Sequence, residues 1–538
     1  MRRIYMNEDD AHFTSNHPAE DMTVAGLQRL VDYYAEETQV AAILFCTNLQ
    51  KALFDSKVWE PLYEGYDPEG GPDQPFLALL DPAHREIIPG DHARNWVHNL
   101  WLLDRGRGID RFNVWLDRCR HHGIEGWLTM RMNDCHGLKE YEQRLRGEGE
   151  HDSWAMLCPS RFWREHPELR RAPYRWERSW EGAFDFRHEQ VRAHHLALIR
   201  ELCERFDMDG LELDWLRWGM NFAPGQEAAG RPLLTAFVRE ARKLVDACAQ
   251  RVGHPVQLGV RVPAAPQTAW SLGYDAPAWA REGLIDQVTL SSMGGLANFD
   301  YPIEHWRLLL GEGIRLLAHG AGVGSPYPDY GKPVGHDEIH HGVAASALQR
   351  GADGIYLFNE CYRESGDPAG LKSMLQRIGD LATLADQPRR HFASFPGMRA
   401  AGDPVQAVLP IRLRNDRHGW DFGRMEDNIS VRIPIGPKPR KGTAHLLLAF
   451  SPDTSTLKGK DLPVRLNGTP LKPVAVHPPA ALAVNTIDWT RDYSDRIGQF
   501  LGYRIPLSAL QADNNLVEIL PPAVKGELRW AEIIISGT

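Results

Sequence analysis

Residues capable of acid–base chemistry follow two apolar runs of the chain. The first run ends in Asn7, Glu8, Asp9 and Asp10, and a later run continues into Met130-Arg131-Met132-Asn133-Asp134-Cys135-His136. Carboxylate and imidazole side chains are common proton donors and acceptors in general acid–base catalysis. Carboxylates contributed by several positions are also what hydrolysis at a sugar centre requires.

Other apolar runs end in similar residues. They are Thr47, Asn48, Glu212, Asp214, Arg217, Arg261, Ser291, Ser292, His319, Asn359 and Glu360. Charged groups that converge on one cavity lose hydration at a high cost unless they are paired, so we expect structural ion pairs to explain roughly a third of them. Because the residues follow several different runs, a shared functional site is the favoured explanation for the rest.

The elements that must position these residues alternate between strands and helices, as a parallel α/β architecture requires. The predicted strands are 2–8, 40–47, 125–132, 209–216, 256–263, 285–292, 314–319 and 353–359. The predicted helices are 23–37, 108–122, 188–206, 231–252, 276–283, 302–311, 336–350 and 370–380. This succession predicts a (β/α)8 TIM barrel, whose active site lies where the strands end. A doubly wound open sheet is the alternative.

We place the barrel at residues 1–385, with two long loops at 48–107 and 133–187. Long loops on this face usually form lids or pocket walls. Gln387-Pro388-Arg389-Arg390 is interpreted as a linker, and short alternating runs over 396–538 predict a β-sandwich.

The sequence leaves the role of the β-sandwich open. Asn467-Gly468 is a hairpin-turn signal inside it. The domain could bind carbohydrate, cap the barrel as a packing module, or form the contact of a homodimer.

The bulk composition limits the partners. The formal charge of −10 argues against nucleic-acid binding, and no apolar run is long enough to span a membrane. The first ten residues lack the apolar segment of a signal peptide, so we expect a cytoplasmic protein. The seven cysteines have no CxxC spacing and are expected to be reduced thiols rather than disulfides or zinc ligands.

Other catalytic and metal signals are weak. The GxSxG, Walker and HExxH motifs are absent, and no GxGxxG follows a strand. His336, His340 and His341 fall on the first turns of a predicted helix, where an exposed helix start is favoured over a metal site. We expect neither a metal nor a cofactor.

Tryptophans are concentrated in the loops and strand ends of the expected active face. They are Trp59, Trp96, Trp101, Trp154, Trp163, Trp176, Trp180, Trp215, Trp218 and Trp270. An indole ring can stack on a sugar ring and donate a hydrogen bond to a hydroxyl. Tryptophan also tends to be buried, so we expect about half of them to fill the cores of the long loops.

Two segments carry a family resemblance. Met130–His136 resembles a signature of barrel glycosidases, as does Asn7-Glu8-Asp9-Asp10 together with the segment 209–217 (DGLELDWLR). Many of these proteins are labelled family-10-like glycosylhydrolases. Within that group the chain is most similar to the inverting sialidases of glycoside hydrolase family 156. The resemblance covers residues 1–380 and is specific to the superfamily rather than to one sugar.

The resemblance implies an exo-sialidase that hydrolyses sialosides by single displacement, without a covalent intermediate. It implies His136 as the acid and Asp9 or Asp10 as the base. If Ile4 and Met6 face the helices, strand alternation sends Asp9 inward. Arg131 would hold the substrate carboxylate, since a guanidinium matches that group.

The other residues expected to bind substrate are Asn48, Asn133, Asp214, Arg217, Arg261, Asn359 and Glu360. One alternative is a retaining glycosidase for neutral sugars, which would use Glu360 with either Asp214 or Glu212. Another is a non-catalytic carbohydrate-binding barrel. The number of intact carboxylates at strand ends counts against the latter.

Overall fold

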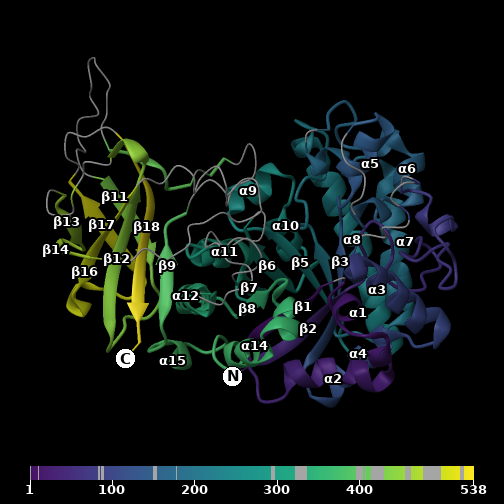
Figure 1. Ribbon diagram of the computed structural model, residues 1–538, viewed down its shortest axis with the longest axis horizontal. Coiled ribbons are helices and arrows are strands. Elements are labelled where there is room, and N and C mark those ends of the chain that lie inside the picture. The colour runs from purple at the N-terminus through teal and green to yellow at the C-terminus, as the bar shows by residue number, and fades with distance from the viewer. Residues whose placement is uncertain are drawn as a thin grey trace.

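A computed structural model gives the fold of the chain (Figure 1). It describes residues 2–9, 11–80, 82, 85, 90–148, 154–176, 178–292, 297–320, 336–394, 404–405, 407–413, 429–454, 458, 462–475, 499–520 and 526–537.

Eight parallel strands close into a barrel in the order β1 to β8. They are β1 Ile4–Glu8, β2 Val40–Cys46, β3 Glu125–Arg131, β4 Gly210–Asp214, β5 Gln257–Pro263, β6 Gln287–Ser291, β7 Arg315–His319 and β8 Gly354–Leu357. Closure is direct, because Ile4 of β1 pairs with Ile355 of β8. The predicted barrel is confirmed, and the open sheet is wrong.

Helices follow the strands and surround the barrel (Figure 1). The principal ones are α2 Val24–Ala35, α4 Arg111–His121, α7 Glu189–Arg205, α8 Glu227–Val252, α10 Ala276–Arg281, α11 Ile303–Leu310, α12 His336–Gln349 and α14 Pro368–Leu375. The loops contribute α1 His12–Asn16, α3 Gly90–Trp101, α5 Leu138–Leu145, α6 Arg161–Glu165, α9 Pro266–Ser271, α13 Arg363–Gly366 and α15 Leu381–Leu384. Within the described residues, no helix combines the length and apolarity needed to cross a membrane.

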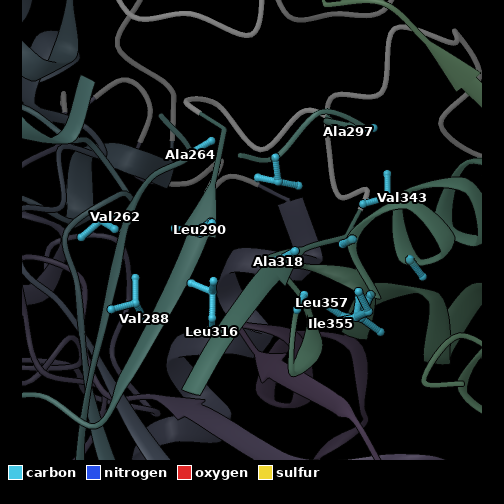
Figure 2. Packing of buried hydrophobic residues seen from close by; sticks show 14 of the residues in the cluster. Val262, Ala264, Val288, Leu290, Ala297, Leu316, Ala318, Val343, Ile355 and Leu357 are labelled. Carbon is cyan, nitrogen blue, oxygen red and sulfur yellow. The ribbon is translucent and has the colours of Figure 1, made fainter. Parts of the chain in front are cut away.

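Strand alternation separates two apolar layers. Tyr5, Trp127 and Tyr356 belong to the cluster inside the barrel, whereas Ile4 and Met6 belong to the core shared with the helices. Figure 2 shows part of that outer layer, with strand residues such as Val288 and Leu316 beside one another. Each fully buried side chain of this kind contributes roughly 1.5–3 kcal/mol. The alternation turns every second residue at a strand end toward the barrel mouth.

The C-terminal region forms two antiparallel sheets, which confirms the predicted β-domain. The first contains β10 Ile411–Arg412, β18 Glu527–Ser536, β12 Thr443–Phe450, β16 Gln499–Ile505 and β15 Lys472–Val474. The second contains β11 Ile429–Pro434, β17 Asn514–Ile519, β13 Val464–Leu466 and β14 Thr469–Pro470. Asn467 and Gly468 join β13 to β14 with positive φ angles of 50° and 78°, so the hairpin prediction is confirmed.

The linker interpretation of 387–390 is wrong. Strand β9, Arg389–Phe392, begins there and pairs with β18 in the first sheet. Arg389 is fully buried and donates to the carbonyl oxygens of Ala385 and Ile435. The pairing partner of β9 lies far away in the sequence, so no local signal marks the segment as a strand.

The β-domain packs on the barrel through α12. A Cβ at Gly342 of α12 would lie 2.0 Å from the Arg390 carbonyl oxygen, and one at Gly436 would lie 2.4 Å from that of Ala345. Arg390 also forms an ion pair with Glu338 at 2.8 Å. In Figure 1, β9 lies between α12 and the rest of the β-domain. This geometry supports the packing role among the three that the sequence left open.

Candidate active site

The inward-facing strand-end residues form one ring at the barrel mouth, which is polar apart from one phenylalanine. It comprises Asp9, Arg131, Asp214, Arg261, Ser291, His319 and Phe358, from β3 to β7 and from the segments directly after β1 and β8. All of them are buried. Strand alternation accounts for this ring. Tyr5 and Trp127 face inward four positions before Asp9 and Arg131, and Tyr356 faces inward two positions before Phe358.

Asp9 is fixed at the mouth by two donors. The Arg131 guanidinium forms a very short ion pair with Oδ1 of Asp9, and the Tyr362 hydroxyl donates to Oδ2 at 3.1 Å. Arg131 also contacts Oδ2 of Asp134 at 3.3 Å. Arg131 is therefore committed to two carboxylates of the protein. Asp10, the other candidate base, lies outside the described residues.

His136 is held by the carboxylate two residues before it. Its Nδ1 lies 2.9 Å from Oδ1 and 3.0 Å from Oδ2 of Asp134, and its backbone N–H donates to the same carboxylate at 3.0 Å. Burial alone would raise the pKa of Asp134, but His136, Arg131 and Arg217 hold it well below its usual value. Asp134 is therefore ionised at neutral pH and fixes the proton of His136 on Nδ1.

The other ring nitrogen of His136 faces Arg217 and Trp218. Nη2 of Arg217 lies 3.4 Å from Nε2, and the Trp218 ring meets the imidazole edge-on at 5.5 Å. The His136 side chain is 22% exposed. It therefore combines a buried, charge-fixed edge with an accessible one, which is the arrangement that proton transfer to a bound ligand needs.

Among the described residues, Arg217 is the arginine at the mouth with the fewest polar partners. It lies 5.1 Å from the centroid of the Phe358 ring, and its buried Nε has no hydrogen-bond partner among the described residues. Within the described part of the chain, Arg217 forms no ion pair with a carboxylate. It is therefore available to an anionic ligand.

Arg261 is committed to the far side of the ring. It donates to Asp214 at 2.9 Å and to the Ser291 hydroxyl at 3.2 Å. Ser291 also contacts Nδ1 of His319 at 3.0 Å. Burial lowers the pKa of His319 well below its usual value, and Arg261 and His340 add to this effect. His319 is therefore neutral and cannot replace an arginine in binding an anion.

Glu212 lies inside the barrel, one inward-facing position below Asp214. Its carboxylate accepts hydrogen bonds from Tyr356 at 2.8 Å, Thr129 at 2.9 Å and Thr289 at 3.3 Å. Burial, with a contribution from Asp214, raises its pKa to about 7. The side chain is fully buried, so these contacts describe a structural carboxyl group rather than one that reaches a substrate.

Two asparagines predicted to bind substrate hold backbone instead. The Asn48 amide donates to the Leu49 and Arg131 carbonyl oxygens and accepts from the Arg131 N–H, tying β2 to β3. The Asn133 amide exchanges two hydrogen bonds of 2.9 Å with the backbone of Phe184. Both side chains are buried, and they position the loops around His136.

Asn359 has a buried polar atom that lacks a partner. Its backbone has a φ of 61°, directly after β8, and its Oδ1 has no hydrogen-bond partner in the described structure. A strained left-handed residue with an unsatisfied carbonyl is often part of a functional site. These two features are compatible with a role of Asn359 in ligand binding, which stays a prediction of the sequence.

Glu360 is paired with a helix residue. Nε2 of His340 lies 3.0 Å from its carboxylate, and both side chains are buried. His341 is buried as well, so the expected exposed helix start is wrong for His340 and His341. Helix α12 is covered by the β-domain and by the loop after β8, which a local pattern could not reveal. The side chain of His336 lies outside the described part.

A small cavity lies beside Asp9, between the ends of β1 and β2 and helix α4. Its lining consists of Glu8, Asp9, Phe13, Thr14, Cys46, Arg111 and Trp115. Nε and Nη1 of Arg111, Nε1 of Trp115 and Oγ1 of Thr14 are buried without a hydrogen-bond partner among the described residues. Donors that face a cavity in this way can bind a water molecule or a small polar group.

The tryptophans divide into buried and partly exposed side chains. Among those whose side chains are described, Trp59, Trp96, Trp163 and Trp176 are buried in the two long loops, and Trp215 is buried directly after β4. Trp218 is half-buried beside His136, where it can serve as a platform for a sugar ring, and Trp270 is 50% exposed under Arg231. The side chain of Trp154 is outside the described part.

Two residues of the site escaped the sequence interpretation. Tyr362 was missed because it lies in the loop after β8, and only barrel closure brings that loop to Asp9. Phe358 was missed because an aromatic residue at a strand end is also a normal core residue. Here it supports the guanidinium groups of Arg217 and Arg261, at 5.1 and 4.1 Å. Its inward position after β8 was the available signal.

No protein-family model and no curated protein matches the chain. Similar solved structures include α-L-fucosidase isoenzyme 2 from Paenibacillus thiaminolyticus, at 13% identity and a TM-score of 0.39 over 70% of this chain and 48% of that one. Isoenzyme 1 of the same organism has 14% identity and a TM-score of 0.32 over 96% of both chains. A family GH18 chitinase from Chromobacterium violaceum has 11% identity and a TM-score of 0.35 over 100% of this chain and 89% of that one.

The chain thus spans about half the length of isoenzyme 2. All three likenesses are too distant to carry an inference about activity.

Proposed function

We propose that the protein is a glycoside hydrolase that releases terminal sialic acid from sialosides with inversion of configuration. The observation that carries the proposal is the position of His136 between the Asp134 carboxylate and the Arg217 guanidinium, beside Trp218. A proton donor, a partner for an anionic group and a platform for a sugar ring thus lie within one small region of the barrel mouth.

His136 is the acid in this proposal. The ionised Asp134 carboxylate fixes its Nδ1 proton and its orientation, so Nε2 is the atom that delivers a proton to the leaving oxygen. An imidazole acid suits a substrate that already carries a carboxylate. A second carboxylic acid close to that group would suffer like-charge repulsion once it had given up its proton.

Arg217 binds the substrate carboxylate in this proposal. Arg131 and Arg261 are the other candidates, but both already pair with protein carboxylates. When Arg217 turns to the substrate, its guanidinium no longer faces Nε2 of His136, so that nitrogen can carry the acid proton. Binding of an anionic sugar thereby prepares the acid, and neutral glycosides lack this effect.

The base is one of the neighbouring carboxylates Asp9 and Asp10. Both oxygens of Asp9 accept hydrogen bonds, from Arg131 and from Tyr362. A carboxylate has roughly four acceptor positions on its two oxygens, so these two bonds do not by themselves prevent Asp9 from taking a proton from water. Single Asp→Ala variants at the two positions distinguish the base from the carboxylate that positions Arg131.

The test is hydrolysis of a 4-nitrophenyl sialoside and of a sialic acid linked to a sugar, followed by proton NMR. The first product should have the anomeric configuration opposite to that of the substrate. His136→Ala should lower kcat by roughly 10²–10⁴-fold on the sugar-linked substrate, whose leaving group needs a proton. The loss should be much smaller on the nitrophenyl substrate, because nitrophenolate leaves without one.

Arg217→Met tests the anionic subsite, with Arg231→Met as the matched control. Arg231 also stacks on an aromatic ring, with its guanidinium 3.6 Å from the Trp270 centroid, but it lies outside the mouth. Arg217→Met should raise KM for sialosides at least tenfold, and Arg231→Met should not. Retained configuration, or hydrolysis of neutral glycosides alone, contradicts the proposal.

A further inference from the structure

Three side chains with metal-binding atoms meet where the barrel closes. His12 belongs to α1, His17 follows that helix, and Glu364 belongs to α13 after β8. One ligand atom from each lies within 4.8 Å of the other two. Nε2 of His12 is 3.7 Å from Oε2 of Glu364, and Nε2 of His17 is 3.3 Å from the same oxygen.

The separations of the two histidine nitrogens from Glu364 fit a tetrahedral metal site. Zinc bonds to nitrogen and oxygen are about 2.0–2.2 Å long, so two ligands of a tetrahedral zinc ion are roughly 3.4 Å apart. The two distances to Glu364 differ from that spacing by a few tenths of an ångström. Two imidazoles and one carboxylate favour zinc over magnesium or calcium, which prefer oxygen ligands.

His12 is already oriented for metal binding. Its Nδ1 lies 2.7 Å from Oε1 of Glu8, and the Tyr34 hydroxyl donates to the other oxygen of Glu8 at 2.9 Å. The Glu8 carboxylate therefore fixes the His12 proton on Nδ1 and leaves the Nε2 lone pair for a ligand. A carboxylate behind a histidine is the usual second layer of a zinc site. His12 is fully buried, and its Nε2 has no hydrogen-bond partner among the described residues.

His17 and Glu364 form the outer half of the cluster. The His17 ring stacks on Phe13 with centroids 4.6 Å apart, and its Nδ1 lies 3.8 Å from Oδ2 of Asp21. The His17 and Glu364 side chains are 20% and 19% exposed. The cluster therefore has one buried, rigid ligand and two that an ion can reach from solvent.

We propose that His12, His17 and Glu364 form a zinc site, with water as the fourth ligand. The ion would join the segment after β1 to the segment after β8. The His12 ring also meets the Tyr362 ring edge-on at 5.4 Å, and Tyr362 donates to Asp9. The zinc ion would thus stabilise one wall of the barrel mouth. This proposal does not depend on the sialidase proposal, since it concerns different residues.

The test uses the full-length protein after treatment with a chelator. Isothermal titration with Zn²⁺ should give one site per chain, and elemental analysis of the dialysed complex should give one equivalent of zinc. Cobalt in the same site should show the intense visible bands of four-coordinate Co²⁺. His17→Ala and Glu364→Gln should each raise Kd at least tenfold. Glu8→Gln, which removes the charge behind His12 but no proposed zinc ligand, should raise it about 10–100-fold.

His166→Ala is the matched control. His166 is a partly exposed histidine whose Nδ1 contacts Glu168 at 2.9 Å, and no third ligand accompanies the pair within the described residues. Its replacement should leave the zinc affinity unchanged. Circular dichroism in chelator checks that each variant folds. Zinc binding that is absent, or that is equally strong in wild type, His17→Ala and Glu364→Gln, would overturn the proposal and leave only an ion-pair cluster.

Discussion

Replacing Glu212 with glutamine tests whether this carboxyl group is structural or catalytic. Burial raises its pKa from 4.5 to about 7, and Asp214 adds to this effect. Between those pH values the unfolded chain has lost the proton that the folded protein still holds. The free energy of unfolding therefore falls as the pH rises from about 4.5 to about 7, and the full loss persists above that range.

The size of the loss follows from the shift. At about 1.4 kcal/mol per pKa unit, the change from 4.5 to about 7 corresponds to roughly 3 kcal/mol. The glutamine side chain of the Glu212→Gln variant is neutral at every pH and could keep the hydrogen bonds from Tyr356 and Thr129 through its carbonyl oxygen. We expect this variant to be slightly less stable than wild type near pH 4.5 and more stable by a few degrees in Tm near pH 8.

The assay is a pair of thermal unfolding series from pH 4.5 to pH 8, with kcat measured on each protein. Thr289→Val is the control, because it removes one donor to Glu212 but leaves the titrating carboxyl group in place. A Tm difference between wild type and Glu212→Gln that does not change with pH would refute the reasoning. A fall in kcat of a hundredfold or more at unchanged Tm would instead favour the retaining mechanism that uses Glu212.

Three further predictions concern the residues around the acid. Asp134→Asn should slow sugar-linked sialoside hydrolysis by about 10²-fold or more through loss of the charge behind His136. Because the pKa of Asp134 is depressed, the loss of stability caused by Asp134→Asn should be greatest at neutral pH and should disappear in strong acid. A denaturation series over pH measures this loss. Gly137→Ala should lower Tm far more than Gly253→Ala. Both residues have positive φ, but only at Gly137 would a Cβ lie 1.7 Å from a backbone oxygen. Equal losses of Tm in the two variants would contradict this prediction. Asn133→Ala should lower Tm, because each buried backbone group left without its hydrogen bond costs roughly 1–3 kcal/mol. A change in KM without a change in Tm would instead support the predicted role of Asn133 in binding substrate.

Local patterns were sufficient to predict the barrel and the mouth. Apolar runs of strand length alternate with helical ones, and these signals depend only on neighbouring residues. Alternation along β1 also placed Asp9 inward, since Ile4 and Met6 do face the helices. The burial of five tryptophans agrees with the general burial tendency of that side chain.

The partners of each polar residue depended on the tertiary structure. Arg131 was predicted to hold the substrate, but the closed barrel pairs it with Asp9 and Asp134. Asn48 was likewise expected to contact hydroxyls, and it ties two strands together instead. Which donor meets which acceptor depends on distances across the barrel, and these distances cannot be derived from local sequence patterns.

The sequence by itself determined the eight barrel strands, the principal helices between them and most of the residues at the strand ends, because periodicity and turn chemistry act over a few residues. Only the tertiary structure decided that Tyr362 meets Asp9, that β9 joins β18, and that His12 lies beside Glu364. Each of these contacts joins segments more than a hundred residues apart in the sequence. They form only when β8 closes on β1 and the β-domain packs on α12, so they follow from the packing of the whole chain.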